Sequence, residues 1–305
     1  MSLILQQIAQ RCRGEVTGGG GVVTPFFADN FTGGVLGAPN QNGAIPGEFT
    51  YYFNGGNPTV SSEKAINGGT HSLKMPFGPN PTGDDDTCEV RFRLGRQVSK
   101  LWVEYWMWVP SNFYMRETIN NKFFSIWRDI GNNSDGNWSY GGWGDGILST
   151  QKFTLEYWGL GGPGAFATTR IACRQDPGSP GSDDFWYITD VPYASNQTGM
   201  IGAGNPMNLG AWNRVRMGFQ ASSANTVSDG KFDMWLNDVH KHHFTGMDCW
   251  NPKWTWNGTM LVPQTRPDDI VFDCGYILGY ANTGFDELTE FYIGDIKFYD
   301  QDPGW

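Results

Sequence analysis

The segment Leu101–Pro110 restricts the fold more than any other part of the chain. Its sequence, LWVEYWMWVP, alternates between two kinds of side chain, and a period of two is the period of a β-strand. The odd-numbered positions form an apolar face of Leu101, Val103, Tyr105, Met107 and Val109. The even-numbered positions before the proline are Trp102, Glu104, Trp106 and Trp108. The pattern predicts a strand with a core on one side and three indoles with one carboxylate on the other.

The face with the indoles has two interpretations. Indole rings can cover the apolar faces of sugar rings, and a carboxylate can accept hydrogen bonds from sugar hydroxyls, so that this face would bind a glycan. Exposed tryptophans are uncommon without such a role. Alternatively, the strand is buried on both sides, and Glu104 pairs with an arginine. The strand alone does not decide between these interpretations.

The composition indicates many short strands joined by turns. The chain of 305 residues has 42 glycines and 17 prolines, with 15% aromatic and only 17% charged residues. Such a chain is typical of an all-β fold, and we expect a two-sheet antiparallel jelly-roll sandwich. The net charge of −10 argues against a nucleic-acid partner, although a local arginine cluster still permits an anionic polysaccharide. No apolar run reaches the roughly 18 residues that a membrane span needs.

Residues 1–25 are expected to form an arm in front of one domain at residues 26–305. Residues 1–16 have apolar positions near helical spacing, and Gly18–Gly21 form a flexible hinge. A helix this short needs a surface to pack on, either its own domain or another protein in an assembly. The apolar stretch at the start is too short for a signal peptide. We therefore expect synthesis inside the cell, and incorporation into a virus particle is one hypothesis.

Ten segments are predicted to be strands from their alternation and from the turn residues between them. They are Gly47–Phe53, Ser72–Met75, Glu89–Leu94, Trp102–Val109, Lys122–Arg128, Thr154–Trp158, Arg214–Gln220, Lys231–Leu236, Tyr276–Tyr280 and Glu290–Tyr299. Residues 159–209, in contrast, are rich in Gly, Pro, Ser and Asn. A loop of that length in a compact domain usually has a function, and one hypothesis is that it covers the binding face.

The polar faces of several predicted strands share one composition. They are rich in Arg, Glu and Trp where an ordinary outer sheet face has Thr, Ser and Lys, and the planar fork of arginine matches a carboxylate or sulfate. The short link between Glu89–Leu94 and Trp102–Val109 predicts that these strands pair as a hairpin. The predicted ligand-binding set is Arg91, Arg93, Trp102, Glu104, Trp106, Trp108, Glu156, Trp158, Arg214, Arg216 and Trp235. Alternatively, Arg–Glu pairs stabilise a sheet that the long loop covers.

Several segments resemble the concanavalin A-like lectin and glucanase jelly rolls. Ala28–Gly34 (ADNFTGG) is similar to the first strand of those domains. Ala211–Gln220 and Gly230–Val239 (AWNRVRMGFQ and GKFDMWLNDV) are similar to a hairpin of the polysaccharide-lyase branch, and the resemblance covers about residues 26–300. It implies a concave sheet that binds a polysaccharide or surface glycan. It also implies a structural calcium, and Asp295 matches the acidic ligand on the last strand, with backbone from around Asp29.

The paired carboxylates of a retaining glycosidase are absent, because Trp106 and Trp108 occupy the positions two and four after Glu104. A polyuronate lyase instead needs a cation that neutralises the uronate carboxylate and a group that transfers protons. The candidates are Arg91 and Arg214 for the first role, and Tyr157 and His240 for the second. The segment Lys122–Arg128 lacks the Gln-x-His motif of the best-known alginate lyases with this fold.

His240 and His242 are expected to share one strand face after the turn at Asn237 and Asp238. Two histidines on one face can bind a metal, but the neighbouring sequence offers no third ligand. A solvated start of a strand is the simpler interpretation.

Two functions stay open from the sequence. The first is a non-catalytic carbohydrate-binding or surface-display protein, such as a decoration or fibre-type structural protein of a virion. The second is a polysaccharide lyase that acts on an anionic uronate polymer through a face lined with arginine and tryptophan. The missing carboxylate pair and the N-terminal arm with its hinge favour the first.

Overall fold

The computed structural model describes residues 22–34, 49–113, 121–127, 152–159, 167–174, 185–188, 207–224, 227, 229–247, 253–256, 261–264, 271–281 and 284–305. All regular elements in these ranges are β-strands, which confirms the predicted all-β class. The predicted N-terminal helix and most of the arm lie outside the described residues. Within the described ranges, no helix has the length and apolar character to cross a membrane.

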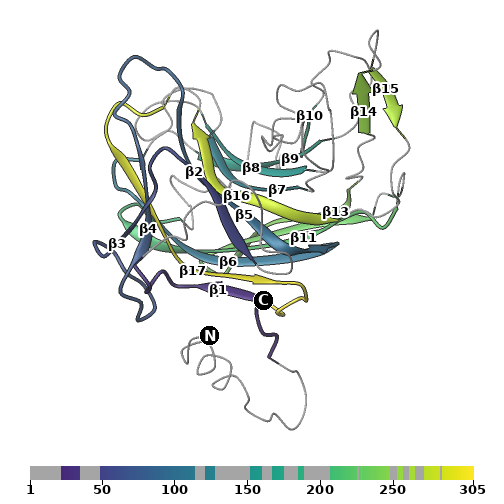
Figure 1. Ribbon diagram of the computed structural model, residues 1–305, viewed down its shortest axis with the longest axis horizontal. Coiled ribbons are helices and arrows are strands. Elements are labelled where there is room, and N and C mark those ends of the chain that lie inside the picture. The colour runs from purple at the N-terminus through teal and green to yellow at the C-terminus, as the bar shows by residue number, and fades with distance from the viewer. Residues whose placement is uncertain are drawn as a thin grey trace.

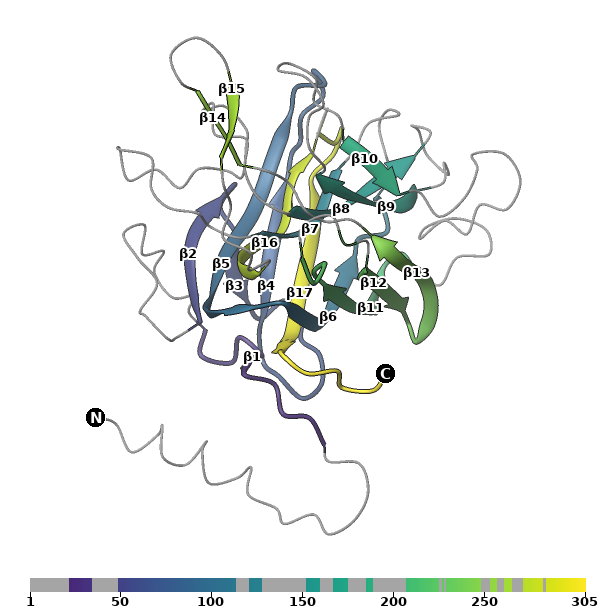
Figure 2. The same ribbon diagram turned by 90° about the vertical axis from the view of Figure 1, so that its right-hand side faces the viewer.

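Two antiparallel sheets form the body of the molecule (Figure 1). Sheet A has the strand order β13–β12–β11–β6–β17–β4–β3, and β1 pairs with β17. Its strands are β1 (Phe27–Asp29), β3 (Thr59–Ser61), β4 (Ser72–Phe77), β6 (Lys100–Val109), β11 (Ala211–Gln220), β12 (Gly230–Leu236), β13 (Val239–Met247) and β17 (Thr289–Tyr299). Figure 2 shows β6, β11, β12 and β13 in this sheet from another side.

Sheet B has the strand order β10–β9–β8–β7–β16–β5–β2. Its strands are β2 (Thr50–Gly55), β5 (Asp86–Val98), β7 (Asn121–Trp127), β8 (Lys152–Gly159), β9 (Ala167–Arg174), β10 (Phe185–Ile188) and β16 (Phe272–Ala281). A separate two-stranded sheet contains β14 (Lys253–Trp256) and β15 (Leu261–Gln264). Sheet B lies above sheet A in Figure 1, so that each sheet has one inner and one outer face.

The core lies between the inner faces of the two sheets. The five residues of the apolar face predicted within Leu101–Val109 are all fully buried there. Aromatic rings join the layers, since the ring centroids of Phe92 on β5 and Phe298 on β17 are 4.9 Å apart. Those of Phe124 on β7 and Phe219 on β11 are 5.8 Å apart. Burial of one such side chain contributes roughly 1.5–3 kcal/mol. The residues that alternate with these core residues consequently form the outer faces.

The predicted hairpin between β5 and β6 is wrong. β5 pairs with β16 and β2 in sheet B, whereas β6 pairs with β11 and β17 in sheet A. Only Ser99 separates the two strands, which is too short a link for a hairpin turn. Gly95, which has a φ of 70°, lies where the register between β5 and β16 is irregular, between Arg93 and Val98. Because the chain passes from one sheet to the other, the polar faces of β5 and β6 point to opposite sides of the sandwich.

All ten predicted strands are present, with ends that differ by a few residues. The prediction of one long loop at residues 159–209 is wrong, because β9 and β10 lie inside it and extend sheet B. The sequence of β9, ATTRIACR, mixes small, polar and charged residues, and its apolar alternation is limited to Ile171 and Cys173. Pairing with β8 places this segment in sheet B, and the sequence pattern of β9 alone does not show that pairing.

Candidate functional site

The structure separates the predicted ligand-binding residues into two groups. Those on the outer face of sheet A are Trp102, Glu104, Trp106, Trp108, Arg214, Arg216 and Trp235. Those on strands of sheet B are Arg91 and Arg93 on β5, and Glu156 and Trp158 on β8. The side chains of the two β8 residues are outside the described part of the structure. The predicted residues therefore do not lie on one common face. The outer faces of the two sheets carry different sets of side chains.

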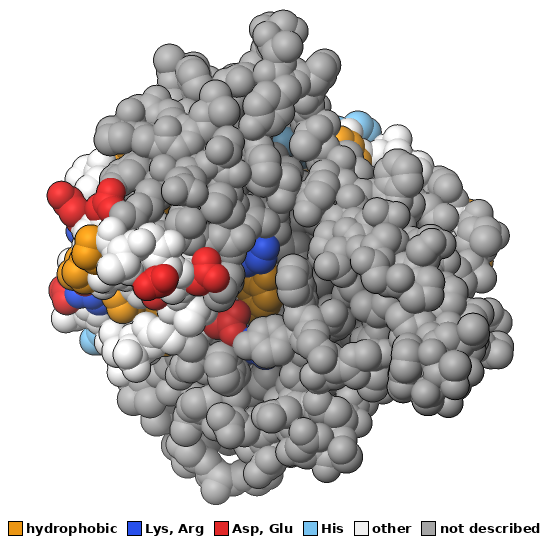
Figure 3. Space-filling view, turned by 90° about the horizontal axis from the view of Figure 1, so that it is seen from above, with side chains coloured by type: hydrophobic (Ala, Val, Ile, Leu, Met, Phe, Trp, Pro, Cys, Tyr) orange, Lys and Arg blue, Asp and Glu red, His pale blue; other side chains and the backbone are white. Residues whose placement is uncertain are grey.

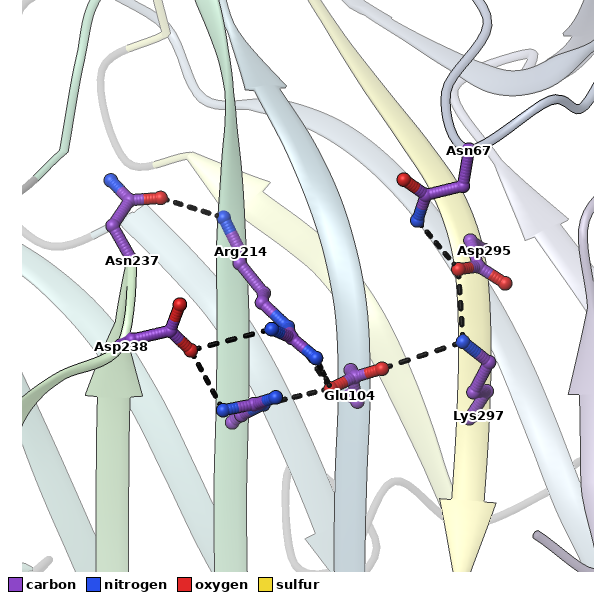
Figure 4. A network of polar contacts seen from close by, with 8 residues as sticks. Asn67, Glu104, Arg214, Asn237, Asp238, Asp295 and Lys297 are labelled. Carbon is purple, nitrogen blue, oxygen red and sulfur yellow. Dashed lines mark hydrogen bonds and ion pairs between the residues drawn. The ribbon is translucent and has the colours of Figure 1, made fainter. Parts of the chain in front are cut away.

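On the outer face of sheet A, Glu104 is the centre of an ion-pair network (Figure 4). Its Oε2 accepts hydrogen bonds from Nη2 of Arg214 at 2.8 Å and from Nε of Arg216 at 2.7 Å. Asp238 Oδ1 lies 3.4 and 2.7 Å from Nη1 of the same two arginines. Nζ of Lys297 lies 3.4 Å from Oε1 of Glu104. The register of β11 against β6 places Arg216 beside Glu104, because these two residues are directly paired.

The network keeps Glu104 ionised. Burial raises the pKa of its carboxyl group, but the hydrogen bond from Arg216 and the charges of Arg214 and Lys297 outweigh burial. The pKa of Glu104 consequently lies below its ordinary value of 4.5. A carboxylate that three cations of its own chain surround has little capacity left for sugar hydroxyls. This arrangement agrees with the interpretation in which Arg–Glu pairs stabilise the sheet.

The indoles of the same face contact neighbouring side chains. Nζ of Lys64 lies 4.0 Å from the centroid of the Trp108 ring, and Trp212 packs edge-on against that ring at 6.0 Å. The guanidinium carbon of Arg214 lies 5.9 Å from the centroid of the Trp106 ring. These contacts give the indoles a role in packing. Binding of a glycan to them stays a prediction.

Asp295, the predicted calcium ligand, lies on β17 where the pairing with β6 is interrupted. Its Oδ2 accepts hydrogen bonds from Nδ2 of Asn67 at 2.7 Å and from Nζ of Lys297 at 2.9 Å (Figure 4). The carboxylate of Asp29 accepts a hydrogen bond from the backbone N–H of Phe31 at 2.7 Å. An ammonium group of the same chain thus already pairs with Oδ2 of Asp295. The described residues do not fit calcium unless Lys297 moves, and calcium stays a prediction.

The outer face of sheet B carries a buried ion pair. Nη2 and Nε of Arg91 donate hydrogen bonds to Oε1 of Glu89 at 2.6 and 2.9 Å, and both side chains are almost fully buried. Arg93 follows two residues later on β5, so that it points to the same face, and it is partly exposed. The face therefore has the Arg91–Glu89 ion pair, in which the two charges cancel, and a second guanidinium group on Arg93. Guanidinium groups bind carboxylates.

Tyr276 of β16 lies next to Arg91. The two residues are directly paired, and Ser125 of β7 is paired with Tyr276 on its other side. Directly opposite residues of antiparallel strands point to the same face, with Cβ atoms about 4.5–5.5 Å apart. Gly275 faces the core, because a Cβ atom there would lie 2.6 Å from the Phe92 ring. Its neighbour Tyr276 consequently points to the outer face, in one row with Arg91 and Ser125.

Sequence reasoning missed Tyr276 as a site residue. In the segment FDCGYILGYA, Cys274 and Tyr276 resemble core residues, and both are nearly fully buried. They form a small cluster separate from the main core between the sheets. Gly275 is the sequence signal that could have identified them. A glycine inside a strand often marks a close approach of other atoms, here on the inner face, so its neighbours Cys274 and Tyr276 point to the outer face.

β16 is irregular beside this row. Its pairing with β7 shifts between Ile277 and Ala281, and Leu278 has a φ of 54°. A left-handed conformation costs a non-glycine residue about 1–2 kcal/mol. Bulges and backbone strain of this kind are concentrated at functional sites. Because Leu278 is paired with Glu89, the strained segment lies against the buried ion pair.

Figure 3 shows the molecule from above, on the side of sheet B. Among the coloured atoms, a basic side chain and hydrophobic side chains lie next to acidic side chains. A guanidinium group can bind a carboxylate, and a phenol beside it can transfer a proton, so this face has the kinds of groups that act on an anionic substrate. The outer face of sheet B, centred on Arg91, Arg93 and Tyr276, is therefore the candidate functional site.

The four residues that the sequence suggested for a lyase are not brought together. Arg91 belongs to the site on sheet B, whereas Arg214 is part of the Glu104 network and His240 lies on β13 in sheet A. Tyr157 lies on β8 in sheet B, and its side chain is outside the described residues. Of the four, Arg91 is the one whose described side chain lies on sheet B, in one row with Tyr276.

The prediction that His240 and His242 share a strand face is wrong. His240 is exposed, whereas His242 is buried. The cause is a register shift between Met234 and Trp235 of β12, which interrupts the alternation along β13.

No protein-family model matches the chain, and no curated protein matches its sequence. Solved structures do match its fold. An endo-β-1,4-glucuronan lyase from the fungus Trichoderma reesei superposes with a TM-score of 0.55 and 14% sequence identity, over 92% of this chain and 99% of that chain. An alginate lyase from Chlorella virus has a TM-score of 0.50 and 10% identity, over 83% of this chain and 93% of that chain. The fold is thus the concanavalin A-like jelly roll, and it is similar to that of these polysaccharide lyases.

Proposed function

We propose that this protein binds an anionic polysaccharide on the outer face of sheet B and cleaves it by β-elimination, as a polyuronate lyase. The observation that carries the proposal is the direct pairing of Arg91 and Tyr276 across β5 and β16. The proposal is supported by the strained bulge of β16 beside this pair and by the likeness in fold, over nearly the whole chain, to a glucuronan lyase.

In the proposed reaction, Arg93 binds the carboxylate of a uronate, and its charge makes the proton on C5 more acidic. Arg91 supports the same negative charge and is held in place by its hydrogen bonds with Glu89. Tyr276 is the proton-transfer group. The C5–H bond breaks and its proton passes to Oη of Tyr276, which acts as a phenolate in this step, while a double bond forms between C4 and C5. The C4–O bond to the leaving sugar breaks, and Tyr276 returns the proton to the leaving oxygen, so that no water is consumed.

A non-catalytic binding protein is the second candidate function. The observation that favours it is that Glu89 already balances Arg91 and that Tyr276 is only 5% exposed. Such a face can attract an anionic glycan without giving the reacting carbon access to the phenol. A display role in a virus particle belongs to this second candidate and stays a prediction.

Incubation of the pure protein with neutral, uronate and sulfated polysaccharides distinguishes the two. We expect uronate polymers to shorten, with one new ultraviolet-absorbing unsaturated end for each cleavage. Retention on a uronate polymer without shortening would support the binding protein instead. Failure to bind or cleave any polymer would contradict both candidates.

A further inference from the structure

The β12–β13 hairpin of sheet A carries a cluster that the proposed reaction does not use. Oδ1 of Asp233 lies 2.9 Å from Nε2 of His240 and 2.6 Å from Nδ1 of His243. The three potential ligand atoms all lie within 4.8 Å of one another. The imidazole side chains are 43% and 59% exposed, and that of Asp233 is 24% exposed, so that an ion can reach them from solvent.

A β-bulge brings these residues together. His240 is paired with Trp235 and His243 with Asp233, so that two residues of β13 stand opposite the single Met234 between them. Residues three apart on a regular strand point to opposite faces. The extra residue in β13 turns both histidines to the face that Asp233 and Trp235 share. Bulges that aim side chains in this way are frequent beside functional sites.

The histidine nearest the turn is also oriented by its surroundings. The His240 ring stacks on the Trp235 indole, with centroids 4.6 Å apart and an angle of 12° between the planes. Trp305 packs edge-on against the same indole, with ring centroids 5.7 Å apart. The stacked ring directs its Nε2 toward Asp233, as the 2.9 Å contact shows. The cluster is therefore arranged before any ion arrives, which lowers the cost of binding.

We propose that Asp233, His240 and His243 bind one divalent transition-metal ion, of which Zn²⁺ is the representative. Two imidazole nitrogens and one carboxylate oxygen are ligands that zinc prefers, and three protein ligands leave a coordination position open. Calcium and magnesium prefer sets made of oxygen alone. Ligand atoms at zinc distances are about 3.3 Å apart in a tetrahedron, so the present hydrogen bonds have to lengthen by under about 1 Å.

The ion would join the edge strand β13 to β12 and present its open position to solvent. Binding to the folded chain in preference to the unfolded chain raises thermal stability, because the ligand shifts the folding equilibrium. The site lies on the outer face of sheet A, whereas the proposed uronate site lies on sheet B. The metal site and the lyase activity can accordingly be tested independently.

The experiment is a calorimetric titration of the chelator-treated full-length chain with ZnCl₂, together with thermal unfolding. We expect one ion per chain and an increase in Tm. His243→Ala should weaken binding at least about 10-fold, because it removes a ligand from an exposed position. Asp233→Asn is the second variant, since it keeps the side-chain size and removes the charged oxygen.

His71→Ala is the matched control. His71 directly precedes β4, and its Nδ1 lies 2.8 Å from Oγ1 of Thr70, not in this cluster. It should bind Zn²⁺ like the unchanged chain. The proposal is overturned if the unchanged chain shows no saturable binding. It is also overturned if both His243→Ala and Asp233→Asn bind with the affinity of the unchanged chain.

Discussion

Replacement of Tyr276 by phenylalanine should lower the rate of uronate-polymer cleavage by about 10²–10⁴-fold, which is the usual contribution of a positioned proton-transfer group. The substitution removes one hydroxyl group and keeps the ring that packs beside Cys274. Binding of the polymer should change little, because the carboxylate is assigned to Arg93 and Arg91. The measurement is the rate at which unsaturated ends appear, together with the dissociation constant of the polymer.

Tyr299→Phe is the matched control for this variant. Tyr299 lies on β17 in sheet A, beside Trp305, and is also mostly buried. Its substitution should leave the cleavage rate unchanged. Full activity of Tyr276→Phe would remove the phenol from the mechanism, and equal losses in both variants would indicate a general effect of losing a hydroxyl group.

Glu104→Gln should lower the free energy of unfolding by about 3 kcal/mol, because two guanidinium groups then lose the carboxylate between them. The side chain of Glu104 is 7% exposed, while those of Arg214 and Arg216 are 28% and 15% exposed. The partly exposed arginines can recover some hydration, which keeps the effect at the lower end of the range for buried pairs. Denaturant unfolding measures the change.

The pH dependence of stability should change in the same variant. Because the folded chain holds the pKa of Glu104 below 4.5, its stabilisation is complete above that value and is lost as the pH falls through the folded-state pKa. Glu104→Gln should lack this part of the acid-induced loss. Asp300→Asn is the control, since its ion pair with Arg96 is exposed and should contribute at most about 1 kcal/mol. If Glu104→Gln is as stable as the unchanged chain, the network has no structural role.

Alternation along single strands was sufficient to predict the fold class, ten strands and the inner face of β6. The two-residue period depends only on local backbone geometry, so it can be read from Leu101–Val109 without knowledge of the partner strands. It also identified Glu104 as a residue with an arginine partner in one of the two interpretations, and the structure supplies Arg214 and Arg216 as those partners.

Alternation does not show which sheet a strand joins. β5 and β6 are neighbours in sequence and each has a polar face, but they belong to different sheets. The predicted single binding face failed for this reason. Alternation also fails at bulges, since one extra residue reverses every later side chain. That is why the partners of His240 are Asp233 and His243 instead of His242. The pairing of Arg91 with Tyr276 joins residues 185 positions apart, and alternation along single strands does not show it.

The assignment of the uronate site to sheet B, and not to the tryptophan-rich face of sheet A, is tested most directly by comparing two variants. Arg93→Gln and Trp106→Ala, each combined with Tyr276→Phe to prevent cleavage, are titrated with a uronate oligosaccharide. We expect Arg93→Gln to weaken binding at least about 10-fold, since hydrogen bonds to charged groups contribute about 1.5–3 kcal/mol. We expect Trp106→Ala to leave the affinity for the oligosaccharide unchanged. Weakened binding in Trp106→Ala with unchanged binding in Arg93→Gln would contradict the assignment and place the glycan on sheet A.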